Sequence, residues 1–351
     1  MFYQKWRTRL AHNWMLLSFL TILSISLLFL AKSAVAADLA VPESTTILAS
    51  TGDNPLMKDC SNTSVGLTPL SDLVGGQYMG FPGGLYPGSN DIPDQHLQMG
   101  LAASQNIVKL SPQGQPDDSG SIVFLSLGMS NTKQEFKKFM RLARGEYDRS
   151  VTLVNGAQGG YDAAALANPN SAYWNKVNGQ LNRMGLSPLQ VQVIWLKDVV
   201  ADETAAFPQD AQRLQGYLRD IVLIIENRYP NVETIYLSSR AYGGYSDPDS
   251  PSPERWAYQS GFAVKWLIES QIDGSDQALA YNNAPWLAWG PYTWADGMIP
   301  RSDGLIWKCS DFESDGVHPG PSAETKVGTM LLDFFSSHPT TQWFPGPRPT
   351  G

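Results

Sequence analysis

Short apolar runs alternate with longer amphipathic segments between residues 121 and 338. The runs have the length of buried strands and lie at 122–127, 151–154, 191–196, 234–238 and 286–289. Segments of helical period follow them at 133–144, 171–184, 209–228, 254–271 and 322–335. Strands that alternate with helices of crossover length predict an α/β fold, in which helices cover both faces of a parallel sheet.

The region before this domain, residues 37–120, has a different composition. It is rich in Gly, Pro, Ser and Asn, and turn signals such as Pro82-Gly83-Gly84 outnumber periodic segments. Its aromatic residues Tyr78, Phe81 and Tyr86 argue against a disordered linker, because disordered segments contain few of them. We therefore predict an ordered, loop-rich extension that packs on a domain of residues 121–338, with a C-terminal tail at 339–351.

The first 36 residues have the pattern of a secretory signal peptide. Lys5, Arg7 and Arg9 precede an apolar run at 14–30, and Ala34-Val35-Ala36 provides a small-residue cleavage site. These features predict cleavage after Ala36 and a secreted or periplasmic protein. The alternative is an uncleaved membrane anchor, because the apolar run approaches the length that spans a bilayer.

The charge balance disfavours nucleic acid and anionic membranes as partners. The full chain has a net charge of −8, and loss of residues 1–36 would leave 21 basic and 33 acidic residues, a net charge of −12. Such a protein is not expected to bind nucleic acid or an anionic membrane, and we expect a small-molecule or glycan ester as its ligand. After cleavage three histidines remain, without a metal-binding motif, and we expect no metal or cofactor.

The two cysteines, Cys60 and Cys309, leave two interpretations open. An exported protein favours a disulfide between the extension and a late loop, whereas two free buried thiols are equally compatible with the sequence.

Candidate chemistry begins at Gly128-Met129-Ser130-Asn131, between the first strand and the first helix. This layout can present a serine hydroxyl at the top of a sheet, beside a helix N-terminus. The alternative is that Ser130 merely caps the helix. The site lies at the carboxyl ends of the strands, where parallel sheets bind ligands, together with Gly159 and Lys197-Asp198.

A serine nucleophile needs a base and an orienting carboxylate. His318 lies in Asp315-Gly316-Val317-His318-Pro319, immediately before the last helix, so aspartate and imidazole share one loop. The other candidates are His96 in the extension and His338 after the last helix. A solvent-exposed loop histidine is the alternative for His318.

These blocks together resemble the SGNH (GDSL-like) hydrolase superfamily. The resemblance covers about residue 121 to the last helix and comprises the serine turn, Asn155-Gly156-Ala157-Gln158-Gly159 after the second strand, and Asp315-Gly316-Val317-His318. It implies a three-layer α/β/α, flavodoxin-like fold and a catalytic triad of Ser130, His318 and Asp315. It also implies that the backbone N–H groups of Ser130 and Gly159 bind the oxyanion.

The sequence departs from the family pattern at two blocks. Met129 replaces the aspartate before the nucleophile. The third block reads Trp195-Leu196-Lys197-Asp198, with Lys197 at the family's oxyanion asparagine and Trp195 at its glycine. Lys197 could donate to the oxyanion, could pair with Asp198 or another carboxylate, or could mark altered chemistry.

Several further residues are candidates for substrate contact. Asn131, Asn155 and Trp195 lie in the motif blocks, and Tyr242 and Trp294 belong to aromatic-rich late loops. Flat rings can bind sugar faces or acyl chains, although tryptophan is usually buried. Arg240 and Arg301 could bind a carboxylate or sulfate, although solvated surface positions are the simpler interpretation.

Together these features predict a secreted serine esterase or deacylase that acts on an ester, such as an acyl group on a carbohydrate. The alternatives are a catalytically weak SGNH-fold protein that binds a glycan or polymer, and an acyltransferase to a sugar.

Overall fold

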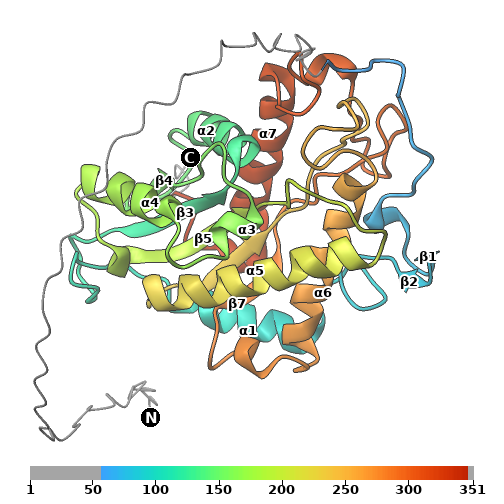
Figure 1. Ribbon diagram of the computed structural model, residues 1–351. Helices are drawn as coiled ribbons and strands as arrows, with labels where there is room; N and C mark the ends of the chain where they lie inside the picture. The colour runs from blue at the N-terminus through green and yellow to red at the C-terminus, as the bar shows by residue number, and fades with distance from the viewer. Residues whose placement is uncertain (1–56, 347–351) are drawn as a thin grey trace, which may run out of the picture. The chain divides into compact units, whose positions relative to one another are not determined.

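The apolar runs form one parallel sheet in the computed structural model, which describes residues 57–346 (Figure 1). The strands of this sheet are β3 (Ile122–Gly128), β4 (Val151–Asn155), β5 (Val191–Lys197), β6 (Thr234–Leu237) and β7 (Trp286–Trp289). They are ordered β4-β3-β5-β6-β7, and every neighbouring pair is parallel. Counted along the chain this is 2-1-3-4-5, the flavodoxin-like order. The predicted fold class is confirmed.

Helices cover both faces of the sheet. They are α1 (Asp94–Gln105), α2 (Ser130–Leu142), α3 (Ala163–Leu166), α4 (Ala172–Arg183), α5 (Gln209–Arg228), α6 (Trp256–Ile272) and α7 (Pro321–Ser337). Right-handed crossovers put α2 on one face and α4, α5 and α6 on the other, because only the first crossover runs toward the β4 edge. Helix α7 packs beside α2, and α5 beside α6 (Figure 1).

The central strand β3 is buried along its whole length, which explains why its sequence is apolar on both faces except at Ser126. The ring of Phe124 lies 5.3 Å from that of Phe136 in α2 and 4.6 Å from that of Phe335 in α7. These contacts join the sheet to the helix that begins at Ser130.

Residues 57–120 lie against the domain and contain the hairpin β1 (Gln77–Tyr78) and β2 (Phe81–Pro82). The ring of Tyr78 packs against Phe207, Tyr258 and Phe262. The segment also contains α1, which the sequence did not predict.

Helix α1 buries His96, Gly100 and Ser104, which do not form an apolar stripe. Gly100 allows the close approach of Trp286, because a Cβ there would lie 2.4 Å from the indole ring. The periodicity that reveals most helices is therefore missing from α1.

Residues 339–346, the described part of the predicted C-terminal tail, contribute to the core. Within residues 339–346, Trp343 is 8% exposed and Phe344 is fully buried, stacked on Phe139. The predicted signal peptide lies outside the described residues. Within residues 57–346, no helix combines the length and apolar character needed to cross a membrane.

Candidate active site

The turn after β3 presents Ser130 at the start of α2. Gly128 pairs with Lys197 at the end of β5 and has a φ of +140°. A Cβ at Gly128 would lie 2.0 Å from the Lys197 carbonyl oxygen, so only glycine fits. Met129 is the N-cap residue and makes no capping bond, while Ser130 is the first helical residue. Ser130 is therefore not the N-cap of this helix, and its hydroxyl is used elsewhere.

The Ser130 hydroxyl lies 2.9 Å from Nε2 of His318, and Nδ1 of His318 lies 2.6 Å from Oδ2 of Asp315. An ionised carboxylate only accepts hydrogen bonds, so Nδ1 carries the proton. The neutral Nε2 then accepts from the Ser130 hydroxyl. Serine, imidazole and carboxylate thus form a continuous chain of hydrogen bonds.

Asp315 is stabilised as a carboxylate by its own loop. Its Oδ1 accepts the backbone N–H groups of Val317 at 2.9 Å and His318 at 3.0 Å. Burial raises the pKa of this carboxyl, but the hydrogen bonds from the His318 ring and from these two N–H groups outweigh burial and hold the pKa below its ordinary value. Asp315 is therefore ionised at neutral pH.

The other two described histidines lie in different environments. The His96 ring bonds the Leu287 carbonyl and the Tyr281 hydroxyl, each at 2.8 Å, and His338 stacks on Phe334. Burial lowers the pKa of each to about 4. Neither contacts Ser130.

Gly159 lies beside Ser130, on the loop after β4. Gln158 N–H donates to the Gly128 carbonyl at 2.9 Å, which holds this loop against the serine turn. A Cβ at Gly159 would lie 3.5 Å from Cβ of Ser130, and Gly159 itself is exposed. The N–H of Ser130, as the first helical residue, has no intrahelical acceptor. Two backbone positions thus flank the hydroxyl.

Lys197 does not occupy the oxyanion position expected for it. Its ammonium bonds both carboxylate oxygens of Glu135, at 2.7 and 2.8 Å, and is fully buried. These contacts agree with the second interpretation of Lys197, in which it pairs with Asp198 or another carboxylate; the partner is Glu135. Asp198 instead accepts the Val199 N–H at 2.8 Å, and burial raises its pKa.

Two donors hold the carbonyl that precedes His318. Asn131 Nδ2 donates to the Val317 oxygen at 2.9 Å, and Nη2 of Arg240 donates to it at 3.3 Å. Both side chains are buried, so Asn131 positions the histidine loop instead of contacting substrate. Arg240 also donates to the Ser252 carbonyl, which excludes the solvated position expected for it. Arg301, likewise buried, donates to the carbonyls of Tyr292 and Trp294.

The remaining candidates for substrate contact have structural roles. Asn155 accepts from the Ser126 hydroxyl and donates to the Lys133 carbonyl. Trp195 is fully buried and donates to Ser238. Tyr242 and Trp294 are also fully buried, where they donate to the Asn62 carbonyl and to Glu254 respectively.

Residues of the N-terminal extension cover aromatic side chains of the late loops. The indole of Trp289 donates to the Leu85 carbonyl, and the Tyr292 hydroxyl accepts the Leu70 N–H. Residues of the extension thus cover rings that a bare domain would expose. The prediction that such rings would bind substrate was wrong for this reason.

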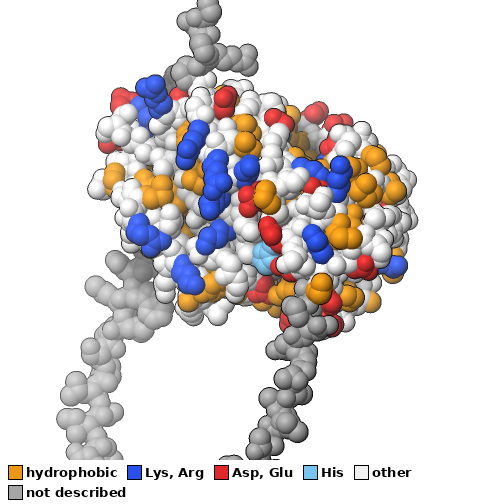
Figure 2. All heavy atoms as spheres, turned by 90° about the horizontal axis from the view of Figure 1, so that it is seen from above, with side chains coloured by type: hydrophobic (Ala, Val, Ile, Leu, Met, Phe, Trp, Pro, Cys, Tyr) orange, Lys and Arg blue, Asp and Glu red, His pale blue; other side chains and the backbone are white. Residues whose placement is uncertain are grey.

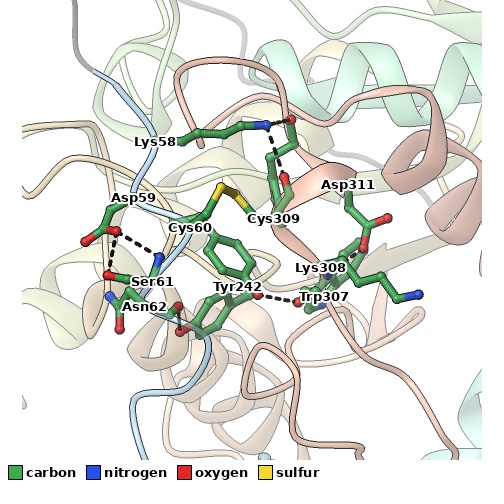
Figure 3. The surroundings of a disulfide bond; sticks show 12 residues. Lys58, Asp59, Cys60, Ser61, Asn62, Tyr242, Trp307, Lys308, Cys309 and Asp311 are labelled. Atoms are coloured by element: carbon green, nitrogen blue, oxygen red, sulfur yellow. Dashed lines mark hydrogen bonds between the residues drawn. A yellow bond between two sulfur atoms is a disulfide. The ribbon is translucent and has the colours of Figure 1, made fainter.

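A disulfide between Cys60 and Cys309 joins the extension to the chain segment that leads to His318 (Figure 3). Beside it, Nζ of Lys58 donates to the carbonyls of Phe312 at 2.8 Å and Cys309 at 3.2 Å. The Lys58 N–H also donates to the Ser314 carbonyl. The extension therefore holds the loop that carries Asp315 and His318.

The comparison with known proteins yields structural similarity only. No family model matches the chain, and no curated protein matches its sequence. Among solved structures, protein YXIM of Bacillus subtilis is 10% identical, with 61% of this chain and 56% of that chain covered and a TM-score of 0.34. The salicylyl-acyltransferase SsfX3 of a tetracycline biosynthetic pathway is 16% identical, with 62% and 54% covered and a TM-score of 0.32.

An extracellular lipase from Streptomyces rimosus is 9% identical, with 62% of this chain and 100% of the lipase covered and a TM-score of 0.32. The matches span only a little over half of the length of the first two proteins. Similarity this weak does not identify a function for the chain.

Proposed function

We propose that this protein is an exported serine esterase of the SGNH type that removes acyl groups from hydroxyl-bearing substrates such as carbohydrates. One observation carries the proposal. Ser130 and His318 are 188 positions apart in the sequence, yet the Ser130 hydroxyl lies 2.9 Å from the His318 ring. The same ring lies 2.6 Å from the Asp315 carboxylate, so the three side chains form one hydrogen-bonded chain. This is the geometry that activates a serine hydroxyl.

The first half-reaction forms an acyl-enzyme. Nε2 of His318 takes the proton of Ser130 as the hydroxyl oxygen attacks the ester carbonyl. Ionised Asp315 holds the ring and stabilises the imidazolium that forms. When the tetrahedral intermediate collapses, the bond between the acyl carbon and the alcohol oxygen breaks, and His318 returns the proton to the leaving alcohol.

The second half-reaction releases the acid. His318 takes a proton from water, and the resulting hydroxide attacks the acyl carbon. The bond to Ser130 breaks, Ser130 recovers its proton, and the carboxylic acid leaves.

The backbone N–H groups of Ser130 and Gly159 are the proposed donors to the oxyanion. Support comes from the position of Ser130 at the first turn of α2 and from the proximity of Gly159, where a Cβ would lie 3.5 Å from Cβ of Ser130. The N-terminal end of α2 favours negative charge at the same place. Lys197 has no part in this assignment because Glu135 binds its ammonium.

The test is hydrolysis of p-nitrophenyl acetate and butyrate by the wild type, by Ser130→Ala and by Ser310→Ala, a change at an exposed serine. Loss of the nucleophile is expected to lower kcat by at least roughly 10⁴-fold. A fluorophosphonate probe should label the wild type and Ser310→Ala but not Ser130→Ala. Undiminished turnover by Ser130→Ala would refute the proposal.

A further inference from the structure

Helix α2 carries a row of basic side chains that begins beside Ser130. We define the basic ridge as Lys133, Lys137 and Arg141 of α2 together with Arg144, which follows the helix; all four are exposed. A period of 3.6 residues places Lys133, Lys137 and Arg141 on the helical face that also bears Ser130. Successive basic residues on this face are about 6 Å apart, and the row runs about 16 Å from the serine to Arg141. Figure 2 shows Lys and Arg side chains gathered in a band on this face, with a histidine beside it.

Among residues 57–346, no carboxylate forms an ion pair with the basic ridge. In the described part of the chain, none of the four side chains makes an ion pair or a side-chain hydrogen bond, whereas Lys109 pairs with Asp118 and Arg213 with Asp202 and Asp210. The one acidic residue of α2, Glu135, faces inward and binds Lys197. Like charges four residues apart destabilise a helix, so this row of basic residues lowers the stability of α2. The chain contains 33 Asp and Glu residues that could have formed ion pairs with the row.

We infer that the basic ridge binds a carboxylated polysaccharide and thereby presents its O-acyl groups to Ser130. This inference rests on the proposed esterase function and specifies its substrate class. A polymer lying along α2 would place carboxylates at the ridge and an ester at the serine on the same helical face. The net negative charge of the chain repels polyanions overall, so attraction is confined to this row and favours a polymer of moderate charge density.

Two other polyanionic partners fit the ridge less well. A helix that lies in a membrane surface carries apolar side chains beside the basic ones, and none of the exposed large hydrophobic residues among 57–346 lies in α2. Single-stranded nucleic acid is bound on exposed aromatic rings, and the exposed large hydrophobic residues of the described chain include no aromatic one.

The test compares the variant Lys137→Gln/Arg141→Gln with Arg149→Gln/Arg183→Gln, which removes the same charge from exposed residues of other segments. The readout is the ratio of kcat/KM for acetylated polygalacturonate to kcat/KM for acetylated xylan, a neutral polymer. The ridge variant is expected to lower this ratio about tenfold, and the control less than twofold. About 0.5 M salt should lower the wild-type ratio similarly, since exposed charges are screened.

A second measurement is independent of catalysis. Full-length Ser130→Ala is titrated with unesterified polygalacturonate, duplex DNA, and vesicles containing anionic lipid. Binding of polygalacturonate that is tighter than binding of the other two, and is weakened by the ridge substitutions, supports the inference. Equal loss in both double variants, or tighter binding of DNA or vesicles, overturns it. If the wild type hydrolyses neither p-nitrophenyl ester, the esterase proposal fails, whereas this titration still decides whether the ridge binds the polymer.

Discussion

Lys197 and Glu135 form a buried ion pair directly behind the serine turn. The ammonium lies 2.7 and 2.8 Å from the two carboxylate oxygens, and the side chains are 0% and 2% exposed. Burial raises the pKa of Glu135 and lowers that of Lys197, because each charge has lost its water. The pair connects the last residue of β5 to the helix that begins with Ser130.

Breaking this pair should destabilise the protein strongly. Lys197→Met leaves the Glu135 carboxylate buried without its partner, and we expect the free energy of unfolding to fall by about 3–5 kcal/mol. Lys197→Met/Glu135→Leu removes both charges and should recover most of that loss. Urea denaturation of the wild type and both variants measures this; a double variant no more stable than the single one would contradict it.

The double variant also separates the two roles considered for Lys197. Because the ammonium is bound to Glu135, we expect kcat of the folded double variant to stay within a few-fold of the wild type. An oxyanion donor would instead be worth roughly 10²–10³ in kcat.

Asp315 orients His318, so Asp315→Asn should reduce catalysis without unfolding the protein. An asparagine can donate to Nδ1 and thereby favour the wrong imidazole tautomer, an effect worth roughly 10⁴ in kcat in the serine protease triad. Steady-state kinetics with p-nitrophenyl acetate, together with a thermal melt, test this. A loss of less than tenfold would show that the Asp315–His318 bond is not needed for turnover.

Asn131 is expected to act as a positioning residue through its bond to the Val317 carbonyl. Asn131→Ala removes a buried hydrogen bond worth about 0.5–1.5 kcal/mol, since Arg240 still donates to the same carbonyl, and loosens the loop that carries His318. We expect kcat to fall about tenfold while KM changes less than twofold. The matched control is Thr132→Val, because Thr132 is buried in the same turn but bonds the Lys197 carbonyl. Equal losses of kcat in both variants would indicate a general effect of destabilising α2.

Glu254 should make stability depend on pH. Burial raises the pKa of its carboxyl to about 7, although N–H groups of Gly243, Trp294 and Tyr258 donate to it. Below about pH 4.5 the group is protonated in both the folded and the unfolded state. As the pH rises from 4.5 to 7, the unfolded state releases this proton first and becomes favoured. The stability associated with protonation is thus present at low pH and lost by pH 7.

The loss would amount to about 3 kcal/mol across this interval. Glu254→Gln mimics the protonated form, so the variant should not lose this stability as the pH rises. Its unfolding free energy should therefore increase relative to that of the wild type from pH 4.5 to 7. Urea titrations at several pH values measure the difference. A constant difference would mean that Glu254 titrates at the same pH in both states.

The sheet and most helices were predictable because their patterns are local. Each strand is a short apolar run, and α5 matches its predicted bounds of residues 209–228. Helix α1 was missed because it buries small and polar side chains against Trp286. The proximity of Ser130, Gly159 and Lys197 followed from parallel topology, since the carboxyl ends of the strands meet at one edge. His318 lies just before α7 and not at a strand end, so its place beside Ser130 was implied only by the family resemblance.

Partners of polar side chains were not predictable. The positions of Glu135 and Lys197 in the sequence do not indicate that the Glu135 side chain is buried, because glutamates in a lysine-rich helix are usually solvated. The aromatic loops were misjudged because the surface that covers them comes from residues more than 200 positions earlier, as in the contact of Leu85 with Trp289. Arg240 was misjudged for a similar reason, because its acceptors belong to two separate loops.

The cystine between positions 60 and 309 makes a covalent ring of the intervening chain, which includes all five strands of the parallel sheet. A protease that cuts one exposed loop inside this ring cannot release a fragment, because both new ends stay tethered through the sulfurs. A singly nicked molecule would migrate as one species on a denaturing gel until a reductant separates it into two. The same ring ties the polypeptide before Cys60 to the segment that bears the imidazole, whatever happens to the loops between them.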